Sequence, residues 1–389
     1  MVPAMKVLHI VKTAVGATWA CEQVRVLRSL GVDVTVALPS DTEGLAPRYR
    51  ESGATVVQAD LDFPAREPWR LPGVLKACHD LVEQVAPDLI HTHHVGTTFV
   101  VRLALQKNSS IPRVFQVAGP LHLENAIFAG FDIRLAGPLD YWIATCQWTQ
   151  RKYFALGISS GRVFLSYAGT DIKPFQNIRS GRLRKELGIA DSVPLVGMVA
   201  YMYAPKWFLG QRQGLKGHED FIAALRLARE SRPEIHGVII GGPWGDASWY
   251  ENRLRDLGSR LCNGSLNFLG TRRDVPELYP DLDLAVVASH SENVGGAVEP
   301  LLSGVPVVAT NVGGLPDLIQ DGKTGWLVPP RNPTALARTI LEALQNKDEA
   351  RRRTIEGQKL ARHLFDVERT GREVAAIYEQ LLARSPQSN

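Results

Sequence analysis

Ala285-Val-Val-Ala-Ser-His-Ser-Glu-Asn-Val-Gly-Gly-Ala-Val-Glu-Pro-Leu-Leu-Ser-Gly-Val-Pro-Val-Val-Ala-Thr310 joins two short apolar runs through a polar turn that contains adjacent glycines. The first run predicts a buried strand ending at Ala288, and the small residues after the turn predict a helix. Gly295 and Gly296 would then present free backbone N–H groups beside a helix N-terminus, which is a common anion-binding arrangement. The stretch therefore predicts an anion site at the end of a buried strand.

Two glutamates flank this turn. Glu299 lies one helical turn after the glycines, where its carboxylate could accept hydrogen bonds from a pair of sugar hydroxyls. Glu292 lies where the strand leaves the sheet. The alternative interpretation is that both are helix-start residues favoured by the helix dipole.

Similar strand-and-helix units extend outward on both sides. Short apolar runs alternate with amphipathic helical periods, which predicts parallel sheets covered by helices on both faces. A polar stretch from Gly169 to Pro194 interrupts the alternation, and the pattern then restarts. We therefore expect an α/β protein with two doubly wound, Rossmann-like domains, residues 1–173 and 174–389. The final helical period, Val374 to Leu381, could pack on either domain.

The composition excludes several classes of protein. The 389 residues are 45% hydrophobic and 22% charged, and the longest stretch without a charged residue, Pro300 to Pro316, is too short to span a membrane. The net charge of +4 is divided evenly between the halves, which argues against a nucleic-acid-binding domain. Neither a G-x-G-x-x-G fingerprint nor a G-x-x-x-x-G-K-[ST] loop is present, which weighs against nicotinamide, flavin and P-loop enzymes.

The cysteines and the amino-terminal residues predict the compartment. The four cysteines are widely spaced and form no C-x-x-C pair, so we expect buried, reduced thiols. A strand-like run, Lys6 to Val11, begins almost at once and lacks the separate apolar region of a signal peptide. We therefore expect a cytoplasmic protein, with peripheral contact at the inner face of the membrane as an option.

The stretch from Ala285 to Asp317 resembles the donor-binding signature of glycosyltransferase family 4, the group 1 glycosyltransferases, which are retaining enzymes with the GT-B fold. The resemblance extends over nearly the whole chain and implies two Rossmann-like domains facing a central cleft. Further segments match in the family's order, the last two more weakly: Phe268–Val275, Leu282–Asp283, Val312–Pro316, Asp321–Val328, Leu89–His93 and Gly169–Asp171.

The resemblance also implies a donor site that lies mainly in the second domain, with the first domain on the acceptor side. Glu299 would bind the ribose of a nucleotide diphosphate sugar, Gly295 and Gly296 would offer amides to it, and Glu292 would contact the donor sugar. Lys216 would hold the diphosphate, although a solvated loop lysine is the alternative. The remaining predicted donor contacts are Gly16, Gly270, Arg273, Val275, Asn293 and Val294.

Two features depart from the family pattern. Tyr201 occupies the position of the usual arginine, and a longer segment separates it from Lys216. Arg212 or Lys206 in this insertion could supply the missing cation, since tyrosine cannot make the bidentate phosphate contacts of arginine. Arg212 could equally be a solvated loop residue. The insertion also holds Trp207 and Phe208, which could contact an acceptor, although we favour packing as the explanation.

The second departure is in spacing. Glu292 precedes Glu299 by seven positions, one fewer than the family pattern expects, and Ser291 stands at the usual separation. Either the turn is one residue shorter and Glu292 keeps the role at the donor sugar, which we favour, or that role is altered.

The histidines of the first domain allow two interpretations. The family usually places a histidine soon after the strand Arg113 to Val117, and His122 is the nearest substitute. It could act at the reaction centre, although a histidine on a half-buried loop is commonly structural. His91, His93 and His94 do not form a helical metal motif, so we predict no metal site.

We therefore predict a retaining, metal-independent glycosyltransferase without a cofactor, in which Lys216, Glu292 and His122 act in catalysis. The expected donor is a UDP-sugar, with GDP-mannose as the alternative. The acceptor would be a glycan, a lipid-linked glycan of surface polysaccharide synthesis, or a small molecule. The competing hypotheses are a nucleotide-sugar epimerase, a phosphorylase, and a non-catalytic nucleotide-sugar-binding protein. No nucleic-acid partner is expected, and the oligomeric state cannot be predicted.

Overall fold

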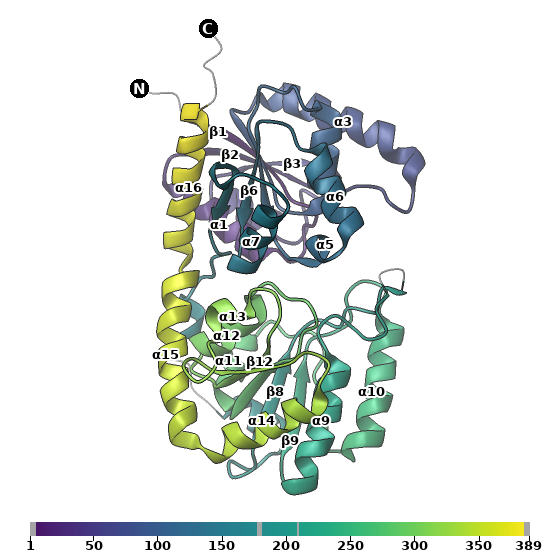
Figure 1. Cartoon of the computed structure of the whole chain (residues 1–389), viewed down its shortest axis with the longest axis vertical. Helices are drawn as coiled ribbons and strands as arrows, with labels where there is room; N and C mark the ends of the chain where they lie inside the picture. Colours follow the sequence, from purple (N-terminus) through teal and green to yellow (C-terminus); the bar gives the residue numbers. More distant parts are fainter. Residues whose placement is uncertain (1–4, 177–180, 208–209, 385–389) are drawn as a thin grey trace. The chain divides into compact units, whose positions relative to one another are not determined.

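The computed structural model describes residues 5–176, 181–207 and 210–384. The chain divides into two compact units, the first comprising Met1–Asp171 and Leu364–Asn389 and the second Ile172–His363. The division lies two residues before the predicted boundary, and the described chain from Leu364 onward returns to the first unit. Each unit contains a parallel sheet with helices on both faces (Figure 1).

The first unit has a seven-stranded sheet in the order β3-β2-β1-β4-β5-β6-β7. Its strands are β1 (Lys6–Ile10), β2 (Asp33–Leu38), β3 (Thr55–Gln58), β4 (Leu89–Thr92), β5 (Arg113–Val117), β6 (Asp140–Ala144) and β7 (Val163–Leu165). The α-helices are α1 (Thr18–Ser29), α2 (Ala46–Glu51), α3 (Leu71–Val85), α4 (Val95–Leu105), α5 (Leu121–Glu124), α6 (Ala126–Leu135), α7 (Gln147–Ala155) and α16 (Val367–Arg384).

The second unit has a six-stranded sheet in the order β10-β9-β8-β11-β12-β13. Its strands are β8 (Leu195–Val199), β9 (His236–Ile240), β10 (Leu266–Phe268), β11 (Leu284–Val287), β12 (Val307–Thr310) and β13 (Trp326–Val328). The α-helices are α8 (Arg182–Leu187), α9 (His218–Ser231), α10 (Ser248–Cys262), α11 (Val275–Leu278), α12 (Gly295–Leu302), α13 (Leu315–Leu318), α14 (Pro333–Gln345) and α15 (Lys347–Phe365), the last of which ends just inside the first unit.

These sheets confirm the predicted α/β class with two doubly wound, Rossmann-like domains. Every strand pair within the two sheets is parallel. The central strands β4, β11 and β12 are buried along their whole length, and β11 consists of apolar residues without alternation, as a strand covered on both faces requires. The predicted cleft between the domains stays a prediction.

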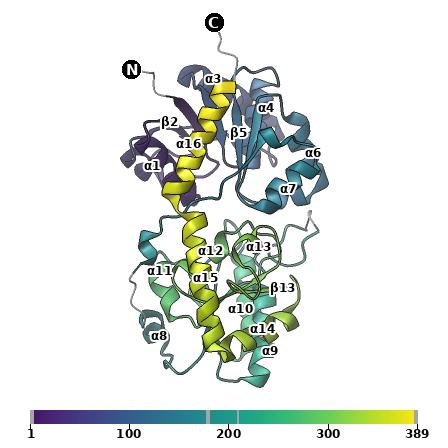
Figure 2. The same ribbon diagram turned by 60° about the vertical axis from the view of Figure 1, so that its left-hand side comes forward.

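Helix α16 settles which unit holds the last helical period. It lies along α1 in the first unit (Figure 2). Val374, Ile377 and Leu381 are buried in the same apolar cluster as α1 and β2. Gly371 permits this close approach, because a Cβ there would lie 2.5 Å from Cγ1 of Val26. The helical periodicity in the sequence therefore indicated the buried face of α16, and this face packs on the first unit.

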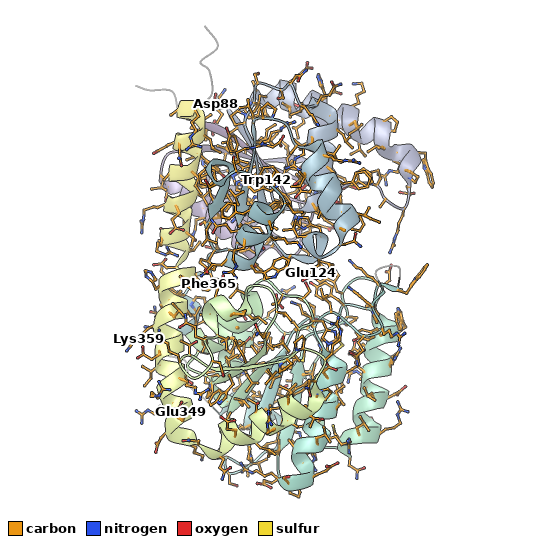
Figure 3. All side chains as sticks on the ribbon, in the orientation of Figure 1. Asp88, Glu124, Trp142, Glu349, Lys359 and Phe365 are labelled. Atoms are coloured by element: carbon orange, nitrogen blue, oxygen red, sulfur yellow. The ribbon has the colours of Figure 1, made fainter. Side chains whose placement is uncertain are left out.

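Other side chains are distributed as expected for two independent cores. Trp142 is fully buried within the first unit, whereas Glu349 and Lys359 extend from the outer side of α15 (Figure 3). All four cysteines are buried, and none forms a disulfide. Among the helices of the described ranges, none combines the length and apolar composition needed to cross a membrane.

Candidate functional site

The topology of the second sheet brings two predicted site residues together. From the central β8 the chain continues to β9 and β10 on one side, then crosses to β11 on the other side. In such sheets the crevice for ligands lies beyond the carboxyl ends of the two strands where the order reverses. Lys216 comes from the connection after β8, and Glu292 from the connection after β11.

Lys216 and Glu292 form an ion pair at this point. The Lys216 ammonium donates a hydrogen bond to Oε2 of Glu292, which also accepts one from Oγ of Ser289 at 2.9 Å. Burial alone would lower the pKa of Lys216, but the adjacent Glu292 carboxylate raises it above the ordinary lysine value. The lysine is therefore charged at neutral pH. Its side chain as a whole is 20% exposed.

The backbone of Glu292 is enclosed by the loop after β12. Gly314 donates its N–H to the carbonyl of Glu292 at 3.3 Å. The preceding Gly313 has a φ of +52°, and a Cβ there would lie 1.8 Å from the same carbonyl oxygen. Only glycine fits this position, so the Gly313-Gly314 pair fixes where the Glu292 carboxylate is presented.

A second close approach positions Lys216. Gly217 has a φ of +73°, and a Cβ there would lie 2.0 Å from the carbonyl oxygen of Ala288 at the end of β11. The carbonyl of Leu215 accepts a hydrogen bond from the N–H of His290 at 2.8 Å. Two backbone contacts therefore tie the segment around Lys216 to the segment that leads to Glu292.

Buried side chains hold the segment around Lys216 in place through hydrogen bonds and an ion pair. The Tyr250 hydroxyl donates to Glu219 at 2.7 Å and accepts from the N–H of Gly214 at 3.0 Å. His290 pairs through Nε2 with Asp220 at 2.7 Å, and both side chains are about 95% buried. The start of α9 thus anchors the connection after β8, although the sequence pattern gave these residues no role.

The predicted anion site lies at the N-terminus of α12. The helix begins at Gly295, which is exposed, and Gly296 follows in a half-buried position. A Cβ at Gly296 would lie 3.6 Å from Oε2 of Glu292, so the glycines and the ion pair adjoin each other. Val294 is buried and Asn293 half-buried beside them. The structure therefore brings Lys216, Glu292 and the two glycines into one site.

Glu299 lies one turn further along α12. Its Oε2 accepts a hydrogen bond from the hydroxyl of Tyr279 at 3.4 Å. Burial raises the pKa of the Glu299 carboxyl, and the Tyr279 hydrogen bond opposes this effect. Tyr279 was missed by sequence reasoning, because nothing in its local pattern distinguishes it from an ordinary core tyrosine.

The loop after β10 holds three further predicted residues. Gly270 has a φ of +64° and pairs with Gly241 in an antiparallel bridge. Arg273 is exposed, and Val275 begins the short helix α11. The neighbouring Arg272, which was not predicted, holds the loop through an ion pair to Asp274 and another to Glu186 of α8.

The insertion after β8 holds the two predicted substitutes for the family arginine, Arg212 and Lys206. Arg212 is exposed, and its side chain makes no ion pair within the part of the chain that the structure describes. Lys206 and Trp207 are exposed as well, and Phe208 lies outside the described residues. Whether Arg212 compensates for Tyr201 therefore stays a prediction.

The remaining predicted residues belong to the first unit. Gly16 has a φ of +82° in the connection between β1 and α1. His122 in α5 is 8% exposed, and its Nε2 lies 3.2 Å from the Tyr153 hydroxyl and 3.5 Å from Oδ2 of Asp132. Asp132 also binds Arg102, which is fully buried. His122 therefore borders a buried polar network.

A histidine chain lies at the carboxyl ends of β1 and β4. His9 Nδ1 is 2.9 Å from His93 Nε2, and the Tyr378 hydroxyl of α16 lies 3.1 Å from His9 Nε2 and 2.5 Å from His91 Nδ1. The nitrogens are close enough to share an ion, but the His91 and His93 rings stack with planes only 19° apart. Lone pairs of stacked rings do not converge, so the geometry suits a hydrogen-bonded chain. His9 and Tyr378 were not predicted as part of it.

Comparisons with known proteins identify the family. Residues 16–173 match the model described as Glycosyltransferase Family 4, and residues 207–360 match the model described as Glycosyl transferases group 1. A D-inositol 3-phosphate glycosyltransferase from Acidothermus cellulolyticus is 29% identical over 349 residues, which cover 81% of this chain and 75% of that protein.

Solved structures show the same fold. The structure of Anabaena Alr3699/HepE in complex with UDP and glucose aligns with a TM-score of 0.78 and 21% identity, over 97% of this chain and all of the other. Sucrose-phosphate synthase from Thermosynechococcus elongatus aligns with a TM-score of 0.79 and 20% identity, over 98% and 100% of the two chains. The chain therefore belongs to the GT-B glycosyltransferases, as a member of glycosyltransferase family 4.

Proposed function

We propose that this glycosyltransferase transfers a sugar from a nucleotide diphosphate sugar to an acceptor hydroxyl with retention of the anomeric configuration and without a metal ion. The observation that carries the proposal is the Lys216–Glu292 ion pair at the switch point of the second sheet, beside the N-terminus of α12. A charged lysine and free helix amides together suit a diphosphate.

Each residue of this site then has a chemical role. Breaking the bond between the anomeric carbon and the diphosphate leaves negative charge on the leaving oxygen. Lys216 and the N–H groups of Gly295 and Gly296 would stabilise that charge as preorganised donors. Glu292 would bind hydroxyls of the donor sugar, and Glu299 those of the ribose. Gly270, Arg273 and Val275 would border the base.

No step requires a carboxylate nucleophile in this scheme. The acceptor hydroxyl attacks on the face from which the diphosphate departs, and the leaving phosphate oxygen takes the hydroxyl proton. Gly16 and His122 lie in the other unit, and their contacts with the donor stay predictions. UDP is the proposed nucleotide, which agrees with the UDP complexes of the HepE fold relative.

The acceptor is less constrained. The relatives named D-inositol 3-phosphate glycosyltransferase favour a small polyhydroxylated acceptor. A glycan or lipid-linked glycan of surface polysaccharide synthesis is the other class we propose. Both classes offer the secondary hydroxyls that the reaction needs.

The proposal is tested by a donor screen followed by product analysis. UDP- and GDP-sugars are titrated into the protein by calorimetry, and the product formed with the best donor is examined by NMR. We expect a UDP-sugar to bind and the product to keep the donor's anomeric configuration. An inverted product would refute retention. Glu299→Ala should weaken nucleotide binding about tenfold, by losing one charge-assisted hydrogen bond of about 1.5 kcal/mol.

One observation favours a second candidate function. Tyr201 stands where the family pattern has an arginine, so this position carries no cation that could bind phosphate. A nucleotide-sugar-binding protein without transferase activity would tolerate this change. Incubation with donor alone and with an acceptor panel separates the two, since tight binding without hydrolysis or transfer would favour the binding protein.

A further inference from the structure

Three aromatic side chains gather at the carboxyl ends of β8 and β9. Beyond the strands, the parallel ladder continues, with Met202 N–H donating to Gly242 at 2.9 Å and Trp244 N–H donating to Met202 at 3.1 Å. Successive side chains of extended backbone point to opposite faces. Met202 is accordingly buried in the core, whereas Tyr201 and Tyr203 both contact the ring of Trp244.

The three rings form what we call the aromatic corner: Tyr201, Tyr203 and Trp244. The Tyr201 ring meets Trp244 edge-on, with centroids 5.1 Å apart and planes at 68°, and Tyr203 lies 5.6 Å away at 34°. Tyr201 remains 40% exposed and Trp244 39%. Two large rings therefore present apolar surface at the ligand-binding edge of the sheet, where a ligand could cover it.

The aromatic corner adjoins the Lys216–Glu292 pair. A Cβ at Gly214, two residues before Lys216, would lie 2.8 Å from the carbonyl oxygen of Tyr203. Burial raises the pKa of the Tyr203 hydroxyl, and the charges of both Lys216 and Glu292 also act on it. The aromatic corner thus offers an apolar surface, and the neighbouring Lys216–Glu292 pair offers charged groups that can form hydrogen bonds. A pyranose ring has the matching chemistry, because it presents C–H groups on one face and hydroxyls at its rim.

We propose that the aromatic corner binds a pyranose ring of the acceptor, so that the acceptor is a glycoside rather than a simple alcohol. This inference rests on the proposed function. Tyr201 occupies the position where the resemblance expects an arginine. An arginine there would contact phosphate, whereas the tyrosine ring offers a flat apolar surface. The nucleoside of the donor is assigned instead to Glu299, which Tyr279 holds in α12.

The test uses saturation-transfer NMR with methyl α-D-glucopyranoside, methyl α-D-galactopyranoside and methyl α-D-mannopyranoside as probes, in the presence of UDP. We expect ring-proton signals from at least one glycoside with the wild-type chain, and none from glycerol. Trp244→Ala and Tyr201→Ala should abolish these signals, and Tyr201→Phe should keep them because the ring remains. Trp69→Ala removes a tryptophan that is 73% exposed in the first unit and should change nothing.

UDP calorimetry on the same variants separates this inference from the proposed function. Trp244→Ala and Tyr201→Ala should bind UDP within about twofold of wild type, because the nucleotide contacts lie elsewhere. The inference is overturned if no glycoside gives a signal, if the alanine variants keep it, or if they lose the uracil signals of UDP instead. Failure of wild type to bind any nucleotide would refute the proposed function, whatever the glycosides do.

Discussion

The Nζ of Lys216 and the Oε2 of Glu292 form an ion pair between residues that lie 76 positions apart in the sequence. The pair forms because β8 and β11 are neighbours in the sheet although β9 and β10 intervene in the chain. A glycine with a positive φ approaches the backbone on each side of the pair: Gly217 lies against the carbonyl of Ala288, and Gly313 against the carbonyl of Glu292. The pair is therefore a product of topology and of two close backbone approaches.

Lys216→Met should weaken UDP binding about 10- to 100-fold, because charge-assisted hydrogen bonds contribute roughly 1.5–3 kcal/mol. It should also leave Glu292 as a partly buried carboxylate without its cation. Glu292→Gln should retain more nucleotide affinity but lose transfer, since it faces the sugar in the proposed scheme. Calorimetry and turnover measurements check both. Lys323→Ala, at an exposed lysine of the same unit, is the control. Equal affinity of Lys216→Met and the control would contradict the assignment.

Gly217→Ala should displace Lys216, because its Cβ would lie 2.0 Å from the Ala288 carbonyl oxygen at a φ of +73°. We expect a loss of about 1–3 kcal/mol in the free energy of unfolding and a clear loss of UDP affinity. Denaturant unfolding and calorimetry measure the two effects.

Gly264→Ala is the matched control for this substitution. Its φ is +78°, but a Cβ there would meet nothing within 4 Å. It should therefore carry the backbone strain without the clash and leave UDP affinity unchanged. If both variants bind UDP as tightly as wild type, the close approach at Gly217 does not position Lys216.

The sequence predicted the order of strands and helices well, and the site in part. Helical periodicity and apolar runs depend on residues that are close together in the sequence. They could therefore predict the strands of the sheets and the buried face of α16. The motif around Glu292 and Glu299 located the glycine turn because its residues are adjacent in the chain. Tyr279 and Gly313 were missed as site residues, since their roles depend on contacts with segments 20 or so positions away.

The histidine chain shows the same limit. His91 and His93 are close together in the sequence, but His9 joins them only because β1 and β4 are adjacent, with His9 opposite His91. Tyr378 comes from the far end of the chain, and only the return of α16 to the first unit brings it there. No local pattern could have assembled this set.

His122→Gln should lower turnover strongly without a large loss in the free energy of unfolding, as its predicted role at the reaction centre requires. The Nε2 of His122 lies 3.2 Å from the Tyr153 hydroxyl, so loss of that contact must be separated from loss of chemistry. Tyr153→Phe removes the same contact, together with the hydrogen bond that the Tyr153 hydroxyl donates to Asp132 at 2.7 Å, and leaves the imidazole in place. We expect it to lower the melting temperature by several degrees, at about 1 kcal/mol for each hydrogen bond lost, and to keep most of the turnover. A matching loss of turnover in both variants would make His122 a purely structural residue.

The histidine chain should make the first unit less stable in mild acid. Burial lowers the pKa of His9 to about 3 and holds the pKa values of His91 and His93 well below the usual range. An unfolded chain binds protons at these histidines below about pH 6.5, whereas the folded chain does not, so stability falls as the pH drops through that window. For His9 alone the loss reaches about 2 kcal/mol at pH 5, at about 1.4 kcal/mol for each unit of pH below 6.5.

Denaturant unfolding at pH 7.5 and pH 5 measures this loss, and His9→Gln should reduce it because glutamine does not titrate. Tyr378→Phe is the control: it removes the hydroxyl between His9 and His91 but leaves all three imidazoles buried. We therefore expect Tyr378→Phe to be less stable at both pH values while its pH dependence stays close to that of wild type. If the free energy of unfolding of His9→Gln falls between pH 7.5 and pH 5 as much as that of wild type, the acid sensitivity arises elsewhere. The histidine chain would then only hold α16 on the sheet through Tyr378.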